Sequence, residues 1–447
     1  MTIAPSKCAG LYLFGAVWLI YGICPPFLSY DSYWSTATAV ELIEHRDTEV
    51  DRLVSTAPRE SWYGLECVPT GGEATHSSPA SGCPGHWYSL YPIGVPVLVT
   101  PLLLLMKAVA ALAAPLTPHT GFFARPEVAA WFAGDFIGGR PLTELWCAST
   151  IGALAVWTQY RVALLVTRRS VALIVALLFA FGTSEWSIAS RNLFPHGLTT
   201  LLLSGAIYFI LRARAASRLS VWAGLLLALA VTVRPSNVIS FVVLMLFLWR
   251  GPSGSKTRAT IPAAAVLAAY AAYYLIVHHS LIPLYVKVAL LPYPWFAGAA
   301  MHLFSPSRGL LIFTPLVLVS GFGAIVALRR GWCAPLSGYL IAIVALHSIL
   351  IFGAWPGHGY GPRFFADLTH IFAFFWIPAI EWWREQAPRP VWAAAAFCVL
   401  AAWSVFVHAR GGASIAANQW SALPINVDRA RWRVWDYSDP QFLRGLK

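Results

Sequence analysis

Long apolar runs recur along almost the whole chain, separated by short polar segments. Most approach 20 residues, the length that a helix needs to cross a bilayer. A segment in lipid must satisfy its own backbone hydrogen bonds, so these runs should be helices. The pattern predicts an all-α, polytopic membrane helix bundle of about eleven transmembrane helices, at residues 10–28, 142–166, 171–188, 197–211, 221–233, 237–249, 261–277, 310–328, 335–352, 364–380 and 391–407.

One further apolar run, at residues 93–114, is also long enough to cross. A crossing there would reverse the side on which every later loop emerges. Pro96 and Pro101 suit an irregular piece lodged against protein. We therefore expect this run to lie in or dip into the outer leaflet, with a true crossing as the alternative.

The charges fix an orientation for these spans. Only 11% of residues are charged, against about 25% in soluble chains. The net charge of +12 would suit a nucleic-acid ligand, but the positive residues cluster in short loops, which is the pattern of cytoplasmic loops in membrane proteins. We expect no nucleic-acid partner, and an outer loop at 29–141 on the same side as the C-terminal tail. The clusters are Arg168 and Arg169; Arg212, Arg214 and Arg218; Arg250, Lys256 and Arg258; Arg329 and Arg330; Arg384 and Arg389.

The outer loop carries most of the acidic residues, twelve of the chain's 19 between positions 31 and 144. Val40, Ile43, Val50 and Val54 recur at helical spacing, which predicts an amphipathic helix lying on the membrane surface. Two cysteines, at positions 67 and 83, follow in a stretch rich in Gly, Pro and Ser. In an oxidising outer compartment they could pair, and unpaired thiols are the alternative.

Single charged groups stand at the outer ends of the spans, where an isolated charge near lipid is expensive unless it meets water, a partner or a substrate. The planar fork of arginine suits phosphate. We therefore expect an outward-facing cavity with one or more carboxylates and several cations able to bind phosphate. The carboxylates are Asp31, Glu144, Glu185 and Asp367, and the basic groups are Arg191, His196, Arg234, Lys287, Arg308, His358 and Arg363.

Each of these groups also has a purely structural interpretation. Arg363 and Asp367 are four residues apart and could pair on a helix. Lys287 and Arg308 could extend to lipid headgroups. His196 could be a packed histidine. Other structural roles are Asp31 as a boundary carboxylate in water, Glu144 as a helix cap, and Glu185 with Arg191 as an interface pair.

Several short motifs stand in a recognisable order. They are YSLYPIGVPVLVTP at 88–101, FPHG at 194–197, VRPSN at 233–237, LFSPSRGLLIFTP at 303–315 and GYGPRFFADL at 359–368. With an aspartate just after the first span, they resemble the GT-C superfamily of integral-membrane glycosyltransferases, in the branch of protein O-mannosyltransferases and lipid A aminoarabinose transferases. The mannosyltransferases commonly have a second acid directly after the aspartate, whereas Ser32 follows Asp31 here. The resemblance implies a catalytic module at 1–385, followed by the last transmembrane helix and an extracytoplasmic tail at 386–447.

The resemblance also implies a function. The donor would be a polyprenyl-phosphate-linked sugar bound from the outer leaflet of the membrane, and the acceptor a glycan, lipid or protein. Asp31 would take the acceptor proton, and arginines would hold the leaving phosphate. We expect no metal and no cofactor, because arginine can supply the positive charge, and a location in a bacterial plasma membrane. The predicted substrate-binding residues are Tyr91, His196, Arg234, Lys287, Arg308, His358, Tyr360, Arg363 and Asp367.

Two other functions use the same features. A transporter or flippase for an anionic lipid-linked substrate would need the arginines but no base. It should also show internal repeats, and none is evident. A scaffold subunit of a cell-envelope complex would need only the large outer loop.

Overall fold

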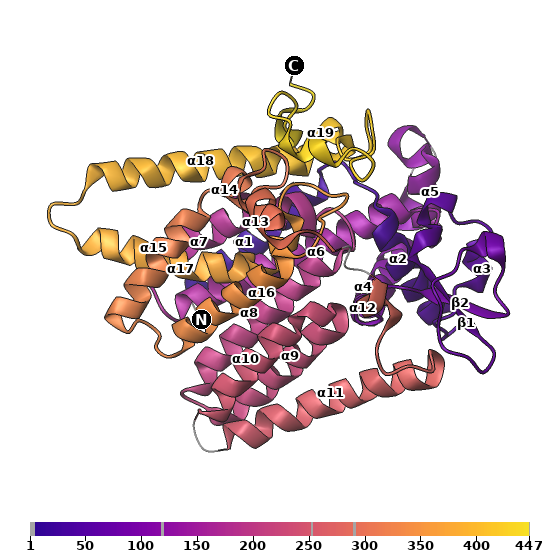
Figure 1. The fold of residues 1–447 in the computed structure, drawn as a ribbon, viewed down its shortest axis with the longest axis horizontal. Coiled ribbons are helices and arrows are strands. Elements are labelled where there is room, and N and C mark those ends of the chain that lie inside the picture. The colour runs from indigo at the N-terminus through magenta and orange to yellow at the C-terminus, as the bar shows by residue number, and fades with distance from the viewer. Residues whose placement is uncertain (1–4, 118–119, 252–253, 289–291, 447) are drawn as a thin grey trace.

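The computed structural model describes residues 5–117, 120–251, 254–288 and 292–446. Its long helices run side by side, with the α17–α18 loop at one end of the bundle and the outer loop at the other (Figure 1). Each of the eleven predicted spans overlaps a helix, although the first helix ends at Gly22 rather than near residue 28, and this confirms the all-α helical class. These helices are α1 (Pro5–Gly22), α6 (Arg140–Leu164), α7 (Arg169–Phe181), α8 (Pro195–Ala213), α9 (Ser220–Val233), α10 (Val238–Trp249), α11 (Ser255–Val277), α14 (Leu310–Phe313) continued by α15 (Val317–Arg330), α16 (Leu336–Phe352), α17 (Thr369–Glu385) and α18 (Val391–Ala413).

The helices at the centre of the bundle are buried, and those at its edge expose apolar side chains. By length and composition, five helical stretches among the described residues could span a membrane, and they differ in burial. Burial reaches 83% in the window containing α17, against 11% in α11 and 17% in α18. The apolar side chains of α11 and α18 therefore face outward from the bundle, as expected for helices that contact lipid.

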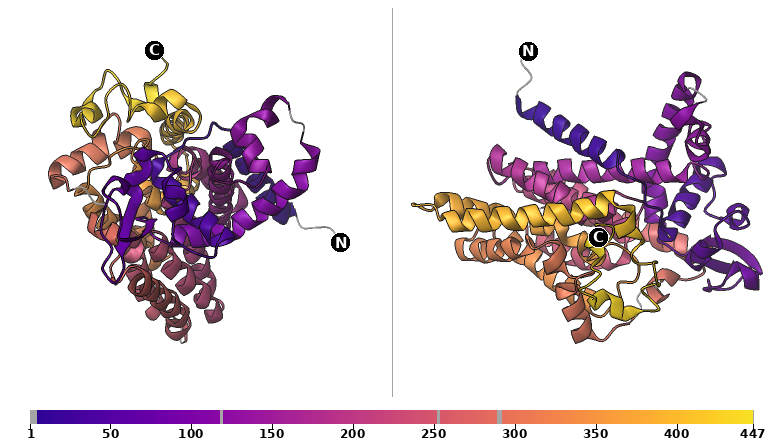
Figure 2. Two further views of the ribbon diagram at one scale, coloured as in Figure 1. Left: turned by 90° about the vertical axis from the view of Figure 1, so that its right-hand side faces the viewer. Right: turned by 90° about the horizontal axis from the view of Figure 1, so that it is seen from above.

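The apolar run that was left over forms α4 (Gly94–Ala113). It is long and apolar enough to cross a membrane, yet it runs across the axis of the long helices rather than along it (Figure 2). It packs chiefly against α2 (Tyr30–Glu44), a helix of the outer loop. This is the direction that a helix lying along the outer surface would take.

The outer loop departs from the predicted amphipathic helix. Instead of one surface helix, α2 ends at Glu44 and the short α3 (Asp51–Val54) follows after a turn. The turn begins at Arg46, whose φ is +58°, and the Asp47 side chain accepts hydrogen bonds from the next two backbone N–H groups. Most of α2 is buried, so the prediction of a surface helix was wrong: the polar residues that follow Glu44 form a turn that the apolar spacing does not reveal.

A small hairpin completes the outer loop. β1 (Leu65–Pro69) pairs antiparallel with β2 (Gly85–Ser89), and Leu65 lies opposite Ser89. Cys67 and Cys83 form a disulfide across a Cα–Cα distance of 5.7 Å, which confirms the predicted pairing.

The C-terminal tail folds back over the outer end of the bundle through α19 (Ile415–Gln419), η9 (Arg431–Trp435) and η10 (Gln441–Leu443). Trp420, Val427 and Val434 are buried against Met301 and Trp355, which belong to α13 (Trp295–Phe304) and to the loop after α16. This apolar contact fixes the tail beside the loop at residues 353–362.

We predict that the end of the bundle bearing the outer loop faces away from the cytoplasm. A single cysteine placed at Ala124 or Leu423, in a background lacking the free cysteines, should react with a membrane-impermeant maleimide in intact cells. One at Ala215 or Thr257, beside the arginine clusters, should react only after lysis. Labelling of Ala215→Cys in intact cells would reverse the orientation.

Candidate functional site

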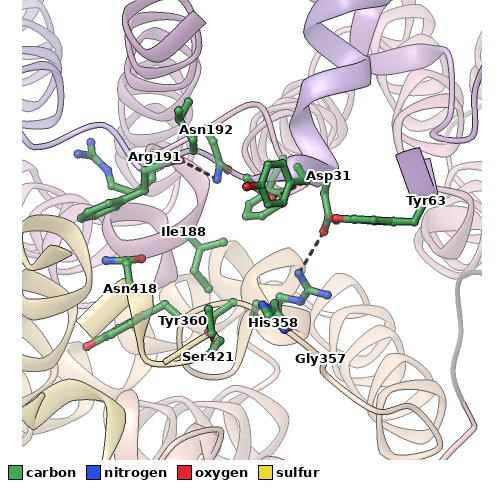
Figure 3. Close-up of a pocket in the computed structure, with 18 of the residues that line it drawn as sticks. Asp31, Tyr63, Ile188, Arg191, Asn192, Gly357, His358, Tyr360, Asn418 and Ser421 are labelled. Carbon is green, nitrogen blue, oxygen red and sulfur yellow. Dashed lines mark hydrogen bonds and ion pairs between the residues drawn. The ribbon is translucent and has the colours of Figure 1, made fainter. Parts of the chain in front are cut away.

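A cavity of about 1200 Å³ lies at the outer end of the bundle. Its walls come from the outer loop, the segment before α8, Arg234 after α9, residues 285 and 288, the loop after α16 and the C-terminal tail. Figure 3 shows Asp31 and Tyr63 on one side, and Tyr360, Asn418 and Ser421 on another. Segments more than 300 residues apart in sequence thus enclose one space.

Asp31 lies in the first turn of α2. Pro25 and Pro26 separate α1 from α2, and Ser29 caps α2 by accepting a hydrogen bond from the Asp31 N–H at 3.1 Å. A helix N-terminus favours a negative charge, because its backbone N–H groups point outward. The local sequence therefore places a carboxylate at the cavity wall, on a buried and rigid helix.

Three side chains contact the Asp31 carboxylate. The hydroxyl groups of Tyr63 and Tyr91 both donate hydrogen bonds to Oδ1, the latter at 3.1 Å. Arg363 Nη1 lies 3.4 Å from Oδ2. Burial and the negative charge of Asp31 raise the pKa of Tyr63 and of Tyr91 well above the ordinary value of a tyrosine. Both phenols therefore stay protonated at neutral pH and remain donors to the carboxylate.

A glycine-rich loop positions Arg363. Gly357, Gly359 and Gly361 all have positive φ values, of 56°, 137° and 55°, which other residues adopt only with strain. At Gly361 a Cβ atom would also lie 2.4 Å from the ring of Phe313. This loop turns the chain into η8 (Arg363–Leu368) and brings the guanidinium group beside Asp31.

A second charged cluster lies next to the first. Asp367 is buried, and its two oxygens lie 2.7 Å from His196 Nδ1 and 2.8 Å from Arg234 Nη1. His196 lies in the first turn of α8, and Arg234 directly follows Val233, the last residue of α9. Arg234 lines the main cavity, whereas His196 lines a small adjoining pocket that shares Asp31 and Arg363 with it. The ion pair with the buried Asp367 thus fixes the Arg234 side chain at the cavity wall.

These contacts decide between the structural alternatives. Arg363 pairs with Asp31 rather than with Asp367. Glu144 is buried with Arg140 and accepts hydrogen bonds from Ser32 and Thr36, so it joins α6 to α2. The expected interface pair does not form. Glu185 accepts a hydrogen bond from Thr200, and Arg191 donates to the carbonyl oxygens of Tyr21 and Gly412 at the ends of α1 and α18.

The structure places six of the ten predicted site residues on the main cavity and His196 on the adjoining pocket. The six are Asp31, Tyr91, Arg234, His358, Tyr360 and Arg363. His358 bonds to Asn426 of the tail at 3.0 Å, and the Tyr360 hydroxyl donates to the carbonyl oxygen of Val407 at 2.6 Å.

Lys287 and Arg308 do not line either space. Lys287 lies on the surface in α12 (Leu284–Val288), with its ammonium group 3.9 Å from Glu73. Arg308 is buried under the tail, where it donates to Gln441 at 2.7 Å and to Ser421 at 2.9 Å. The tail that covers Arg308 lies more than 100 residues later in the sequence, so sequence spacing alone could not separate Arg308 from Arg363.

We predict that Arg308→Ala lowers stability without lowering donor affinity in the protein that remains folded. The side chain is 1% exposed and ties the tail to the loop at residues 353–362. Removing the side chain leaves several buried hydrogen-bond acceptors without a donor, and each unsatisfied acceptor costs about 1–3 kcal/mol of stability. Thermal unfolding of the purified variant in detergent should show the loss. An unchanged melting temperature with weakened binding of polyprenyl phosphate would return Arg308 to the substrate site.

Sequence reasoning missed several cavity residues. Tyr63 is one aromatic residue among many in the chain, and nothing near it marks a site. The C-terminal tail contributes polar side chains to the wall. Their position depends on the packing of the tail against distant parts of the chain, which the sequence does not reveal. Further missed residues on the wall are Glu60, His76, Arg140, Asn192, Asn418, Gln419, Ser421, Asn426 and Asp428, whereas Arg191, which also lies there, was expected from the sequence.

Among the described residues, one group could hold a metal ion. Glu49, Asp51 and His86 have ligand atoms within 4.8 Å of one another, on the surface of the outer loop. Hydrogen bonds account for their closeness, because Asp51 accepts from the backbone of Trp87 at 2.7 Å and lies 2.8 Å from the His86 ring. The three residues do not line the cavity.

The cavity wall places the Asp31 carboxylate beside Arg363, and Arg234 lines the same space. A carboxylate on a rigid helix can accept a proton. Arginines at its edge can bind an anionic group and stabilise charge that develops on it. The arrangement therefore suits transfer chemistry in which a hydroxyl group is deprotonated and an anion leaves.

No protein-family model matches the chain, and no curated protein matches it. Among solved structures, the chain is similar to the apo crystal structure of the oligosaccharyltransferase of Archaeoglobus fulgidus, with a TM-score of 0.42 and 12% identical residues. The alignment covers 97% of this chain and 60% of the archaeal one, so the chain spans about 60% of the length of that protein.

Proposed function

We propose that the protein is a glycosyltransferase that moves a sugar from a polyprenyl-phosphate donor to an acceptor at the extracytoplasmic face of a bacterial plasma membrane. The observation that carries this proposal is the contact between Asp31 and Arg363 at the wall of a large cavity. A carboxylate that can take the acceptor proton lies there beside a cation that can bind the leaving phosphate, and sugar transfer requires both. The order of the motifs that resemble GT-C enzymes supports the same reaction class.

The reaction would proceed by displacement at the anomeric carbon. The acceptor is a glycan, a lipid or a protein, and its hydroxyl group or another nucleophile attacks that carbon as Asp31 takes its proton. The bond from the anomeric carbon to the phosphate oxygen breaks, and the electron pair leaves with polyprenyl phosphate. Arg363 and Arg234 stabilise the negative charge on that phosphate.

The charges around the cavity are arranged for an anionic donor. Arg234 keeps its ion pair with Asp367, so it stays in place when the site is empty. The contact between Arg363 and Asp31 is longer, at 3.4 Å, and Arg363 Nε has no hydrogen-bond partner among the described residues. A buried donor without a partner is costly. Arg363 is therefore held less firmly than Arg234, and its side chain lines the cavity in which an anionic group would bind.

The test is a transfer assay with the purified protein in nanodiscs. A panel of polyprenyl-phosphate sugars labelled in the sugar is offered with a crude acceptor fraction, and release of polyprenyl phosphate is followed by mass spectrometry. Cleavage of one donor that depends on Asp31 is the expected result. Translocation of a lipid across the membrane without cleavage would instead show a flippase.

A further inference from the structure

The two tyrosines at Asp31 reach it from the two ends of one hairpin. Tyr63 stands two residues before Leu65, the first residue of β1, and Tyr91 stands two residues after Ser89, the last residue of β2. Because Leu65 pairs with Ser89, both tyrosines leave the same end of the sheet. The two segments remain paired beyond the strands, because the Leu90 N–H donates a hydrogen bond to the Gly64 carbonyl oxygen at 2.9 Å.

The hairpin is fixed to the helix that carries Asp31. Trp34, one turn further along α2, is fully buried, and its indole N–H donates to the carbonyl oxygen of Ser61 at 2.7 Å. Ser61 belongs to η1 (Arg59–Gly64), the segment that carries Tyr63. At Gly64 a Cβ atom would lie 2.7 Å from the Trp34 ring and 2.9 Å from the Tyr91 ring, so the backbone approaches both closely. The positions of the two phenols relative to Asp31 are therefore set by rigid contacts.

Both phenols contact the same carboxylate oxygen. Oδ1 accepts from Tyr63 and from Tyr91, whereas among the described residues Oδ2 has one polar contact, at 3.4 Å from Arg363. A carboxylate held twice on one oxygen cannot rotate freely about its side-chain bonds. Oδ2 is then the oxygen with room for a further hydrogen bond, and it is also the one beside the cation.

Resting on the proposed function, we propose that Tyr63 and Tyr91 are positioning residues that hold Oδ1 of Asp31, so that Oδ2 is the oxygen that takes the acceptor proton next to the departing phosphate. The hairpin end thereby sets the direction in which the base acts. Neither tyrosine exchanges a proton in the reaction. Their effect is geometric, and a misplacement of about 1 Å at a reacting group can cost about 100-fold in rate.

The test compares phenylalanine variants in two backgrounds. In the native background, the double variant Tyr63→Phe with Tyr91→Phe should lower kcat roughly 10- to 100-fold, since the base loses its orientation. Binding of polyprenyl phosphate, KM for the donor and the thermal melting temperature should stay near those of the native protein. In the Asp31→Asn background the same two changes should lower the residual rate by less than about twofold, because no base remains to be positioned.

Tyr88→Phe is the matched control. Its hydroxyl also donates to a carboxylate, Glu49, at 3.2 Å, but outside the cavity, and its loss should leave kcat unchanged. Should the double variant fail to fold, either single variant allows the same comparison, with a smaller effect. If Asp31→Asn is inactive while the double variant keeps full kcat, the positioning role is refuted and the proposed function stands. An equal loss in both backgrounds also refutes it, since the tyrosines would then act independently of Asp31. Full activity of Asp31→Asn would overturn the base and the positioning role together.

Discussion

Asp31→Asn should lower sugar transfer roughly 10²- to 10⁴-fold, the usual contribution of a positioned general base. Asparagine keeps the shape of the side chain and can still accept hydrogen bonds from Tyr63 and Tyr91 through its amide oxygen. It cannot take a proton from the acceptor. The variant should therefore fold, bind polyprenyl phosphate and fail only in turnover, which the nanodisc transfer assay measures directly.

Glu44→Gln provides the control for this prediction. Glu44 ends the same helix, is exposed, and lies 3.4 Å from Lys107 outside the cavity. Its loss should change transfer by less than about twofold, since exposed ion pairs contribute about 1 kcal/mol or less to stability. A structural aspartate at position 31 would show the opposite result from a base: poor folding, with the surviving protein still active.

Arg363→Ala should produce the second largest effect, on donor binding. A charge-assisted hydrogen bond contributes about 1.5–3 kcal/mol, so the dissociation constant for polyprenyl phosphate should rise roughly 10- to 150-fold. The product lipid is the better probe, because its binding needs no catalysis. Equilibrium binding of radiolabelled polyprenyl phosphate to protein in nanodiscs gives the number.

Arg389→Ala serves as the comparison for Arg363→Ala. It removes an equal charge from the exposed loop between α17 and α18, far along the bundle from the cavity, and its affinity should match that of the native protein. If both variants bind equally well, the phosphate lies elsewhere, and Arg234 is the next candidate. Equal weakening in both would indicate a general effect of net charge on lipid binding.

The helices could be predicted from the sequence because lipid imposes one strict rule on each of them. Every spanning backbone must bond to itself, so apolar length alone indicates a helix, as at α8 and α11. The outer loop is governed by no such rule. There the break between α2 and α3 depends on the positive φ of Arg46 and on a hydrogen bond that the Asp47 side chain accepts from the backbone. The spacing of apolar residues reveals neither of them.

The site was predictable only in part, for a related reason. Asp31 and Arg363 were evident because a charge beside an apolar span is unusual in itself. Arg308 met the same criterion, yet it is covered by the tail, which lies more than 100 residues later in sequence. Tyr63 carries no charge and was not singled out. Which charge faces a cavity and which is covered depends on long-range packing, and that is invisible in a single sequence.

The distance along the chain between Asp31 and Arg363 has a consequence for biosynthesis. Membrane helices enter the bilayer in order as the ribosome proceeds, so Asp31 is made and inserted beside α1 long before Arg363 and the tail residues that close the cavity have been made. The nascent protein would expose a carboxylate without its cationic neighbour. Under the proposed function, a chain truncated before residue 428 should accordingly insert into the membrane and yet show no sugar transfer in the nanodisc assay.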